Sequence, residues 1–151
     1  MKRITFVCLG NICRSPMAEL IMKDIVKKRG LENEFIINSK GTSSEELGNP
    51  VYYATEPIYK RLNIDYSKKR AEKLRKSDYF ESDLFVGMDF QNIAQMERIF
   101  GGDPDNKICL IMDYTSRGGE VSDPWWTRDF EKAYQDILEG VNGLLEYLLK
   151  N

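Results

Sequence analysis

The chain has 151 residues, of which 42% are hydrophobic, so it suits one domain with a buried core. Its 22 basic and 24 acidic residues give a net charge of −2, which offers no reason to expect nucleic-acid binding. The apolar runs are too short for a membrane span or a leader, and three cysteines without a histidine argue against a disulfide framework and a metal site. We therefore expect a single cytoplasmic domain over residues 1–151, with no metal, no cofactor and no membrane insertion.

Strand-like and helical patterns alternate along the chain. Four short apolar runs predict strands, over residues 3–8, 34–38, 84–88 and 107–112. Amphipathic segments predict helices, over residues 16–29, near 56–62, from the third strand to about 100, and over 130–149. The alternation predicts an α/β fold: a single-domain, doubly wound, four-stranded parallel sheet with helices on both faces. A ligand site is then expected at the carboxyl ends of the strands.

The segment CLGNICRSP, residues 8–16, joins the first predicted strand to the first predicted helix. Cys8 ends the strand, and a cysteine attacks as its thiolate, a form that helix N-termini and nearby cations favour. Ser15 is predicted to cap the helix and Pro16 to begin it, so the free N–H groups of the first turn face the loop. Arg14 adds a planar guanidinium that can hold two phosphate oxygens.

The backbone of the same segment suits a bound anion. Gly10 and Asn11 tolerate positive φ, which lets successive N–H groups converge on one point. Nucleotide-type phosphate loops fit less well, because the chain has neither G-x4-G-K-[ST] nor G-x-G-x-x-G. The segment therefore predicts covalent phosphate transfer by Cys8, with the phosphate bound by Leu9, Gly10, Asn11, Ile12, Cys13, Arg14 and Ser15.

Four segments of the chain together resemble the low-molecular-weight protein tyrosine phosphatases. They are VCLGNICRSPMAE at 7–19, SKGTSSEELGNP at 39–50, SDLFVGMDFQNI at 82–93 and VSDPWWTRDFEKAY at 121–134. The resemblance covers nearly the whole chain in order, and its first and last segments are the most specific. It implies hydrolysis of protein phosphotyrosine and of aryl phosphate monoesters, through a cysteinyl-phosphate intermediate and without a metal ion.

The resemblance also implies roles for residues outside the first loop. Asp123, which by itself is part of an Asp-Pro turn signal, becomes the general acid that protonates the leaving oxygen. Asn11, Ser15 and Ser39 become the residues that hold the loop in shape, with Ser15 also assisting the thiolate. Trp125 becomes one wall of the substrate cleft, with Trp126 beside it.

Two departures from the family pattern concern the surroundings of the loop. Glu45 falls where many relatives have an aromatic or large apolar residue, and a carboxylate there would repel acidic peptides and favour basic sequence around the target. Some relatives also support the phosphate loop with a histidine near Lys68, and this chain has no histidine. The basic stretch 68–76 is itself interpreted as a solvated face, in preference to a docking patch.

Other functions on a similar scaffold stay open at this stage. Arginine phosphatases that resemble this chain tend to have threonine at the position of Ile12. Arsenate reductases use two further cysteines, and residues 70–100 contain none. A phosphate-binding module without activity would lack the nucleophile or the acid, but Cys8 and Asp123 are both present. We therefore expect phosphotyrosine proteins as substrates, inorganic phosphate or other oxyanions in the loop, and a monomer or weak dimer.

A second thiol on the loop raises a redox hypothesis. Cys13 follows Cys8 by five residues, and the resemblance suggests that the two can form a reversible disulfide that protects the nucleophile from over-oxidation. The alternative is that Cys13 is an inert buried thiol.

Overall fold

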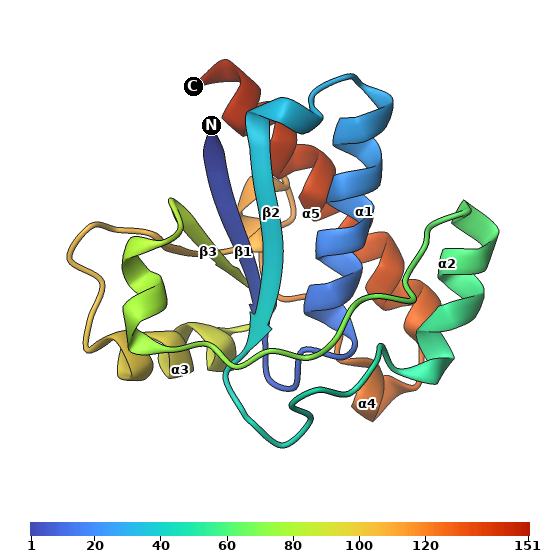
Figure 1. The fold of residues 1–151 in the computed structure, drawn as a ribbon, viewed down its shortest axis with the longest axis horizontal. Coiled ribbons are helices and arrows are strands. Elements are labelled where there is room, and N and C mark those ends of the chain that lie inside the picture. Colours follow the sequence, from blue (N-terminus) through green and yellow to red (C-terminus); the bar gives the residue numbers. More distant parts are fainter.

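A four-stranded parallel sheet forms the centre of the computed structural model, which describes residues 1–151 (Figure 1). Its strands lie in the order β2-β1-β3-β4. Their bounds are β1 (Lys2–Cys8), β2 (Phe35–Gly41), β3 (Leu84–Gly87) and β4 (Ile108–Leu110). All three pairings are parallel, so the four carboxyl ends meet at one edge of the sheet. The predicted four-stranded parallel sheet is confirmed.

Side chains alternate between the two faces of β1, and each face has its own core. Ile4 and Phe6 point into the larger core, whose members come mainly from α1 (Arg14–Lys28) and α5 (Phe130–Lys150). Val7 points the other way and packs with Phe85 and with residues of α3 (Phe90–Phe100). Helices therefore cover both faces, as the alternating pattern predicted.

The remaining elements are short. Helix α4 (Pro124–Thr127) lies near the end of the molecule where β1 and β2 finish, and helix α2 (Glu56–Leu62) lies at the right of the view in Figure 1. Four short 3₁₀-helices connect the larger elements: η1 (Glu32–Glu34), η2 (Tyr53–Thr55), η3 (Lys76–Phe80) and η4 (Ile111–Tyr114). No helix in the chain combines the length and the apolar character that crossing a bilayer requires.

Two strand ends differ from the prediction by more than one residue. Strand β2 continues to Gly41, because Ser39 and the two residues after it stay in register with the end of β1 despite their polar character. Strand β4 stops at Leu110, since the carboxylate of Asp113 accepts the backbone N–H of Leu110 at 3.0 Å and the chain turns into η4. The first change matters for function, because it carries Ser39 to the edge where β1 ends.

Helix α5 approaches the backbone of η4 so closely that only glycine fits at position 143. A Cβ atom at Gly143 would lie 1.9 Å from the carbonyl oxygen of Tyr114. Alanine gains about 0.5–1 kcal/mol over glycine in a helix, but overpacking a core costs about 1–3 kcal/mol or more. We therefore expect Gly143→Ala to lower the urea midpoint of unfolding.

The control for this substitution is Asn142→Ala, one residue earlier on the exposed side of α5. This substitution changes helix propensity without touching η4. The urea midpoint of the Asn142→Ala protein should therefore stay the same or rise slightly. A Gly143→Ala protein as stable as the Asn142→Ala protein would show that α5 and η4 are not tightly packed.

Candidate active site

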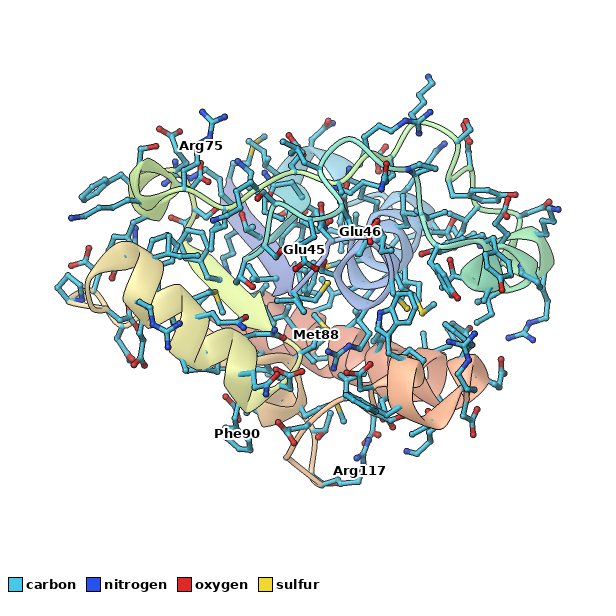
Figure 2. The ribbon with its side chains drawn as sticks, turned by 90° about the horizontal axis from the view of Figure 1, so that it is seen from below. Glu45, Glu46, Arg75, Met88, Phe90 and Arg117 are labelled. Atoms are coloured by element: carbon cyan, nitrogen blue, oxygen red, sulfur yellow. The ribbon has the colours of Figure 1, made fainter.

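The loop between β1 and α1 lies at the carboxyl edge of the sheet, as predicted. Figure 2 looks onto this edge, with Glu45, Glu46 and Met88 near its centre and Phe90 and Arg117 at its border. Two backbone bonds fix the loop to the segment after β2: the carbonyls of Cys8 and Leu9 accept N–H groups at 3.0 and 2.9 Å. The loop thus sits where the strand ends meet.

Positive φ and one close backbone approach shape the loop. Asn11 adopts a φ of 59°, the left-handed conformation that its residue type tolerates. Across from it, a Cβ atom at Gly41 would lie 2.8 Å from the carbonyl oxygen of Leu9. The end of β2 must therefore be glycine for the loop to fold against it.

The sulfur of Cys8 is buried and bonded to a hydroxyl. Ser15 Oγ lies 2.9 Å from Cys8 Sγ, and Asn11 Nδ2 donates to the same Oγ at 2.8 Å. Since Ser15 already accepts from Asn11, its own proton is free to point at the sulfur. A thiolate on Cys8 would therefore receive a hydrogen bond from Ser15, in addition to the field of the first turn of α1.

The hydroxyl of Ser15 does this instead of capping the helix. Helix α1 begins at Arg14, with Cys13 as the residue before it, so the prediction of a Ser15 cap and a Pro16 start is wrong. The carbonyl of Cys13 accepts the N–H of Met17 at 3.2 Å, which closes the first turn. The buried contact with Cys8 outweighs the local preference of serine for the cap position.

Asn11 extends the network away from the sulfur. Its Nδ2 also donates to Ser39 Oγ at 2.9 Å, and its Oδ1 accepts the backbone N–H of Glu72 at 2.9 Å. Ser39 in turn donates to the carboxylate of Glu19 at 2.6 Å. A continuous chain of hydrogen bonds therefore runs from Cys8 through Ser15, Asn11 and Ser39 to Glu19.

Lys69 closes this chain in a protein without histidine. Its ammonium donates to the carbonyl of Ser39 at 3.1 Å and lies 3.3 Å from the Glu19 carboxylate. Both side chains are nearly inaccessible, at 7% and 6% exposed, and Lys23 pairs with Glu19 from the solvent side. The interpretation of the 68–76 stretch as a solvated face is therefore wrong for Lys69. The basic composition of the stretch does not distinguish this buried lysine from its exposed neighbours.

The guanidinium of Arg14 is buried and held from two directions. Its Nη1 donates to the carbonyl of Val121 at 3.1 Å, and its Nη2 donates to Asp89 Oδ2 at 2.8 Å. Burial acts to lower the pKa of Arg14, but the negative charge of Cys8, followed by Asp89 and Asp123, raises that pKa above its ordinary value. Arg14 thus stays charged and fixed in the pocket.

Asp89 is a site residue that the sequence analysis missed. It follows strand β3 and caps α3, where its Oδ1 accepts the N–H of Asn92 at 2.9 Å while its Oδ2 holds Arg14. Two signals could have found it: a carboxylate just beyond the end of a buried parallel strand, and the Asp-x-x-Asn spacing of a helix cap.

Asp123 and the tryptophans come from the segment before α5. Asp123 caps the short helix α4, with Oδ1 accepting the N–H of Trp125 at 3.0 Å, and its Oδ2 lies 3.8 Å from Arg14 Nη2. Trp125 is 48% exposed and packs against Tyr52 with ring centroids 4.6 Å apart. Trp126 is 87% exposed.

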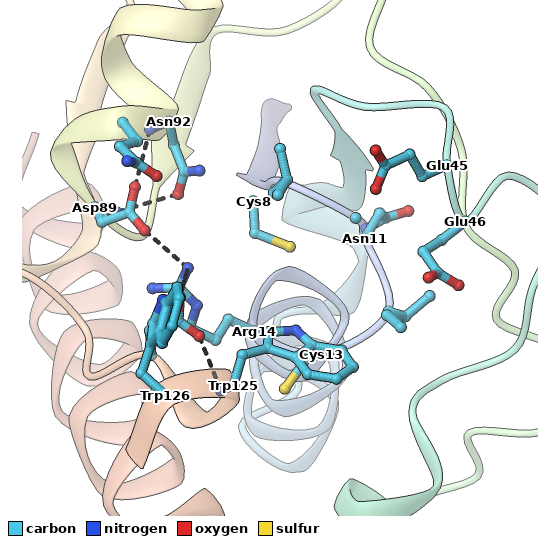
Figure 3. Close-up of a pocket in the computed structure, with 15 residues that line it drawn as sticks. Cys8, Asn11, Cys13, Arg14, Glu45, Glu46, Asp89, Asn92, Trp125 and Trp126 are labelled. Atoms are coloured by element: carbon cyan, nitrogen blue, oxygen red, sulfur yellow. Dashed lines mark hydrogen bonds and ion pairs between the residues drawn. The ribbon is translucent and has the colours of Figure 1, made fainter. Parts of the chain in front are cut away.

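One pocket of about 320 Å³ unites nearly all the predicted residues (Figure 3). Residues 8–14 form its floor, the two tryptophans lie on one side, and Glu45 and Glu46 lie on another. Asp89 and Asp123 also line it, whereas Ser15 and Ser39 are fully buried behind the loop. The pocket therefore combines a thiol, a clamped cation, a carboxyl group and an aromatic wall.

Cys13 also lines the pocket but differs from Cys8 in its chemistry. Burial, and then the negative charge of Cys8, raise the pKa of Cys13 to about 12. Cys13 therefore stays a thiol near neutral pH, and neither residue is in a disulfide in this structure. The protective-disulfide hypothesis remains a prediction. No group of three or more cysteine, aspartate or glutamate side chains is placed to hold a metal ion.

A thiol at the end of a parallel strand, on a loop with a clamped arginine and beside a carboxyl group, defines a cysteine-dependent phosphate-transfer protein. A family model described as low molecular weight phosphotyrosine protein phosphatase matches residues 3–151. The chain belongs to this family, which confirms the resemblance seen in its four segments.

Named relatives agree with this placement. The low molecular weight protein-tyrosine-phosphatase YfkJ of Bacillus subtilis is 35% identical, over 99% of this chain and 97% of its own length. Its crystal structure superposes with a TM-score of 0.95. PtpA of Staphylococcus aureus is 34% identical over 100% of this chain and 96% of its own. The crystal structure of SP-PTP from Streptococcus pyogenes has a TM-score of 0.88 at 39% identity, covering 98% of this chain and 93% of that one.

The contact between Asp89 and Arg14 gives a test of the prediction that Arg14 binds phosphate. Asp89→Ala leaves the guanidinium without its second anchor, so it no longer presents a fixed pair of donors. We expect kcat/KM for an aryl phosphate to fall by roughly a hundredfold, the cost of misplacing a binding group by about 1 Å. Asp89→Asn keeps an oxygen acceptor and should retain most of the activity. Equal activity in the alanine variant and the wild type would contradict the anchoring role.

Proposed function

We propose that this chain hydrolyses phosphotyrosine in proteins, and aryl phosphate monoesters in general, through a phosphocysteine intermediate on Cys8. One observation carries the proposal: Cys8 Sγ, Arg14 and Asp123 meet in a single pocket, with Ser15 bonded to the sulfur and Asp89 to the guanidinium. Family membership and the names of the relatives support the same reaction.

In the first step, the Cys8 thiolate attacks phosphorus while the loop N–H groups and Arg14 hold the equatorial oxygens. An S–P bond forms as the P–O bond to the aryl group breaks. Asp123 gives its proton to the departing oxygen, so the product leaves as a neutral phenol. Arg14 and the loop supply the positive charge that stabilises the transition state, which is why we propose a reaction without a metal ion.

In the second step, water attacks the phosphocysteine. The Asp123 carboxylate, now deprotonated, takes a proton from that water as the new P–O bond forms. The S–P bond breaks and returns its electron pair to Cys8, which Ser15 again stabilises as a thiolate. Inorganic phosphate leaves, and both residues are back in their starting protonation states.

The aromatic wall supports a phenolic substrate over an aliphatic one. Trp125 lines the pocket and also packs against the ring of Tyr52, which lies outside the pocket lining. A phosphotyrosine ring bound against Trp125 would bury apolar surface that a phosphoserine side chain lacks. Its greater length also lets phosphotyrosine reach the loop at the floor of the pocket.

The assignment is tested by phosphate release in EDTA from p-nitrophenyl phosphate, phosphotyrosine, phosphoserine and phosphoarginine. We expect activity on the first two, lost in Cys8→Ser and lowered by about 10²- to 10⁴-fold on phosphotyrosine in Asp123→Ala. Activity confined to phosphoarginine would keep the mechanism and change the substrate. An inactive, fully reduced wild-type protein would overturn the assignment and direct attention to arsenate reduction or phosphate binding.

We further propose that the acidic wall favours phosphotyrosine with basic neighbours. Glu45 is exposed and makes no ion pair or side-chain hydrogen bond, while Glu46 accepts from Asn49 at 2.7 Å. The two carboxylates face the tryptophans across Cys8, and the pocket offers no cation besides Arg14. A lysine or arginine beside the phosphotyrosine would therefore meet an unpaired carboxylate.

Peptides of one sequence with either lysine or glutamate flanking the phosphotyrosine test this preference. We expect kcat/KM to be about twofold to fivefold higher for the lysine peptide, the range of an exposed ion pair, and Glu45→Gln to remove most of the difference. Higher salt should shrink it too. Glu32→Gln makes the same charge change at η1, before strand β2, and should leave the preference intact. A glutamate-flanked peptide cleaved equally well would contradict the proposal.

A further inference from the structure

One buried carboxylate ties helix α5 to the segment that carries Asp123. Asp136 is only 2% exposed and is fully bonded. Its Oδ1 accepts from Arg117 at 2.8 Å and from Lys132 at 2.5 Å, and its Oδ2 accepts the backbone N–H of Ser122 at 3.0 Å. None of these contacts involves the pocket, and the reaction described above makes no use of Asp136.

The position of Ser122 gives the contact its significance. Ser122 immediately precedes Asp123, so the atom that Asp136 holds lies one residue from the proposed general acid. The segment before Ser122 has no regular structure, and its Gly118 and Gly119 both have positive φ, at 66° and 87°. Ser122 therefore needs a restraint from elsewhere in the fold. On the carboxyl side, α4 is a single turn.

Three bonds of different origin fix this segment. The N–H of Val121 donates to the carbonyl of Met88 at 2.9 Å, and the carbonyl of Val121 accepts from Arg14. The third is the bond from Ser122 to Asp136, the only side-chain acceptor for the backbone of Ser122. The first two bonds set the distance of the segment from the sheet and the loop, and the third sets its position against α5.

Burying a carboxylate is costly unless charged partners and hydrogen bonds compensate it. Arg117 and Lys132 supply the charge here, and their side chains remain 44% and 52% exposed, so they can pair with Asp136 without being buried themselves. The two cations hold the side chain of Asp136 in place through its Oδ1, and Oδ2 accepts the backbone N–H of Ser122. The arrangement is thus a rigid acceptor built on the longest helix of the fold.

We propose that Asp136 is a positioning residue, which places Asp123 within reach of the leaving oxygen by fixing the backbone of Ser122. This inference rests on the proposed role of Asp123 as general acid. It has a specific consequence: Asp136 should matter in proportion to how much the leaving group needs a proton. Phenol and tyrosine are poor leaving groups and need one, whereas 2,4-dinitrophenol leaves readily as its anion.

The test compares kcat/KM for phenyl phosphate and for 2,4-dinitrophenyl phosphate, because kcat/KM reports the steps up to departure of the phenol. We expect Asp136→Ala to lower the value for phenyl phosphate by about tenfold or more, since misplacing a reacting group by about 1 Å costs up to a hundredfold. The value for the dinitrophenyl ester should stay close to wild type. Asp136→Asn keeps a carbonyl oxygen for Ser122 and should recover much of the loss.

Glu139→Gln is the matched control. Glu139 lies on the same helix and pairs with the same Arg117 at 3.3 Å, but it makes no contact with Ser122. Glu139→Gln should leave kcat/KM for both substrates unchanged. If Asp136→Ala does not fold, Asp136→Glu keeps the charge and moves the carboxylate by one methylene, and the same selective loss is expected.

If kcat/KM falls equally for both substrates in the folded Asp136 variants, or falls for neither, the positioning role is overturned. Asp123→Ala is measured alongside, to separate this failure from a failure of the proposed function. If Asp123→Ala spares the dinitrophenyl ester and Asp136→Ala shows no selectivity, only the positioning role is wrong. If Asp123→Ala itself shows no selectivity, the general-acid assignment fails, and with it the basis of the inference.

Discussion

The burial of Arg14 is the constraint on which the rest of this site depends. A guanidinium this poorly exposed to water needs acceptors, because an uncompensated buried charge is strongly unfavourable. Its acceptors come from distant parts of the chain: Asp89 beyond strand β3 and the carbonyl of Val121 before α4. Holding Arg14 therefore brings the first loop, the end of β3 and the segment of Asp123 to one point at the carboxyl edge of the sheet.

The sulfur of Cys8 depends on a second arrangement, made of neutral groups near the sulfur and charged groups farther away. Ser15 bonds the sulfur and Asn11 bonds Ser15, while Glu19 and Lys69 close the network behind them. A lysine at this place carries its charge with three donors and no acceptor, whereas a neutral imidazole offers one of each. The chain thus builds its loop support without histidine, from an ammonium group that bonds the carbonyl of Ser39 and the carboxylate of Glu19.

Glu19 and Asp136 share a design in which partly exposed basic residues fix a buried carboxylate, and the carboxylate fixes a segment near the site. Lys23 does this for Glu19, and Arg117 and Lys132 do it for Asp136. The buried carboxylates act as rigid acceptors for Ser39 in one case and for Ser122 in the other. Precision at the pocket is therefore maintained from outside it, through helices α1 and α5.

The sequence by itself determined the α/β class, the four strands and the loop that carries Cys8 and Arg14, because apolar periodicity and a contiguous motif are local properties. Only the tertiary structure decided that Asp89 anchors Arg14, that Lys69 is buried and that Ser15, expected both to cap α1 and to assist the thiolate, bonds the sulfur without capping the helix. Each of these depends on which distant segments meet at the carboxyl edge of the sheet. The sequence can place Asp89 after a strand, at the carboxyl edge, but it does not show whether that aspartate, or a lysine in a basic run, ends in solvent or against a buried partner. Its role is set by the burial and the bonding partners that folding gives it.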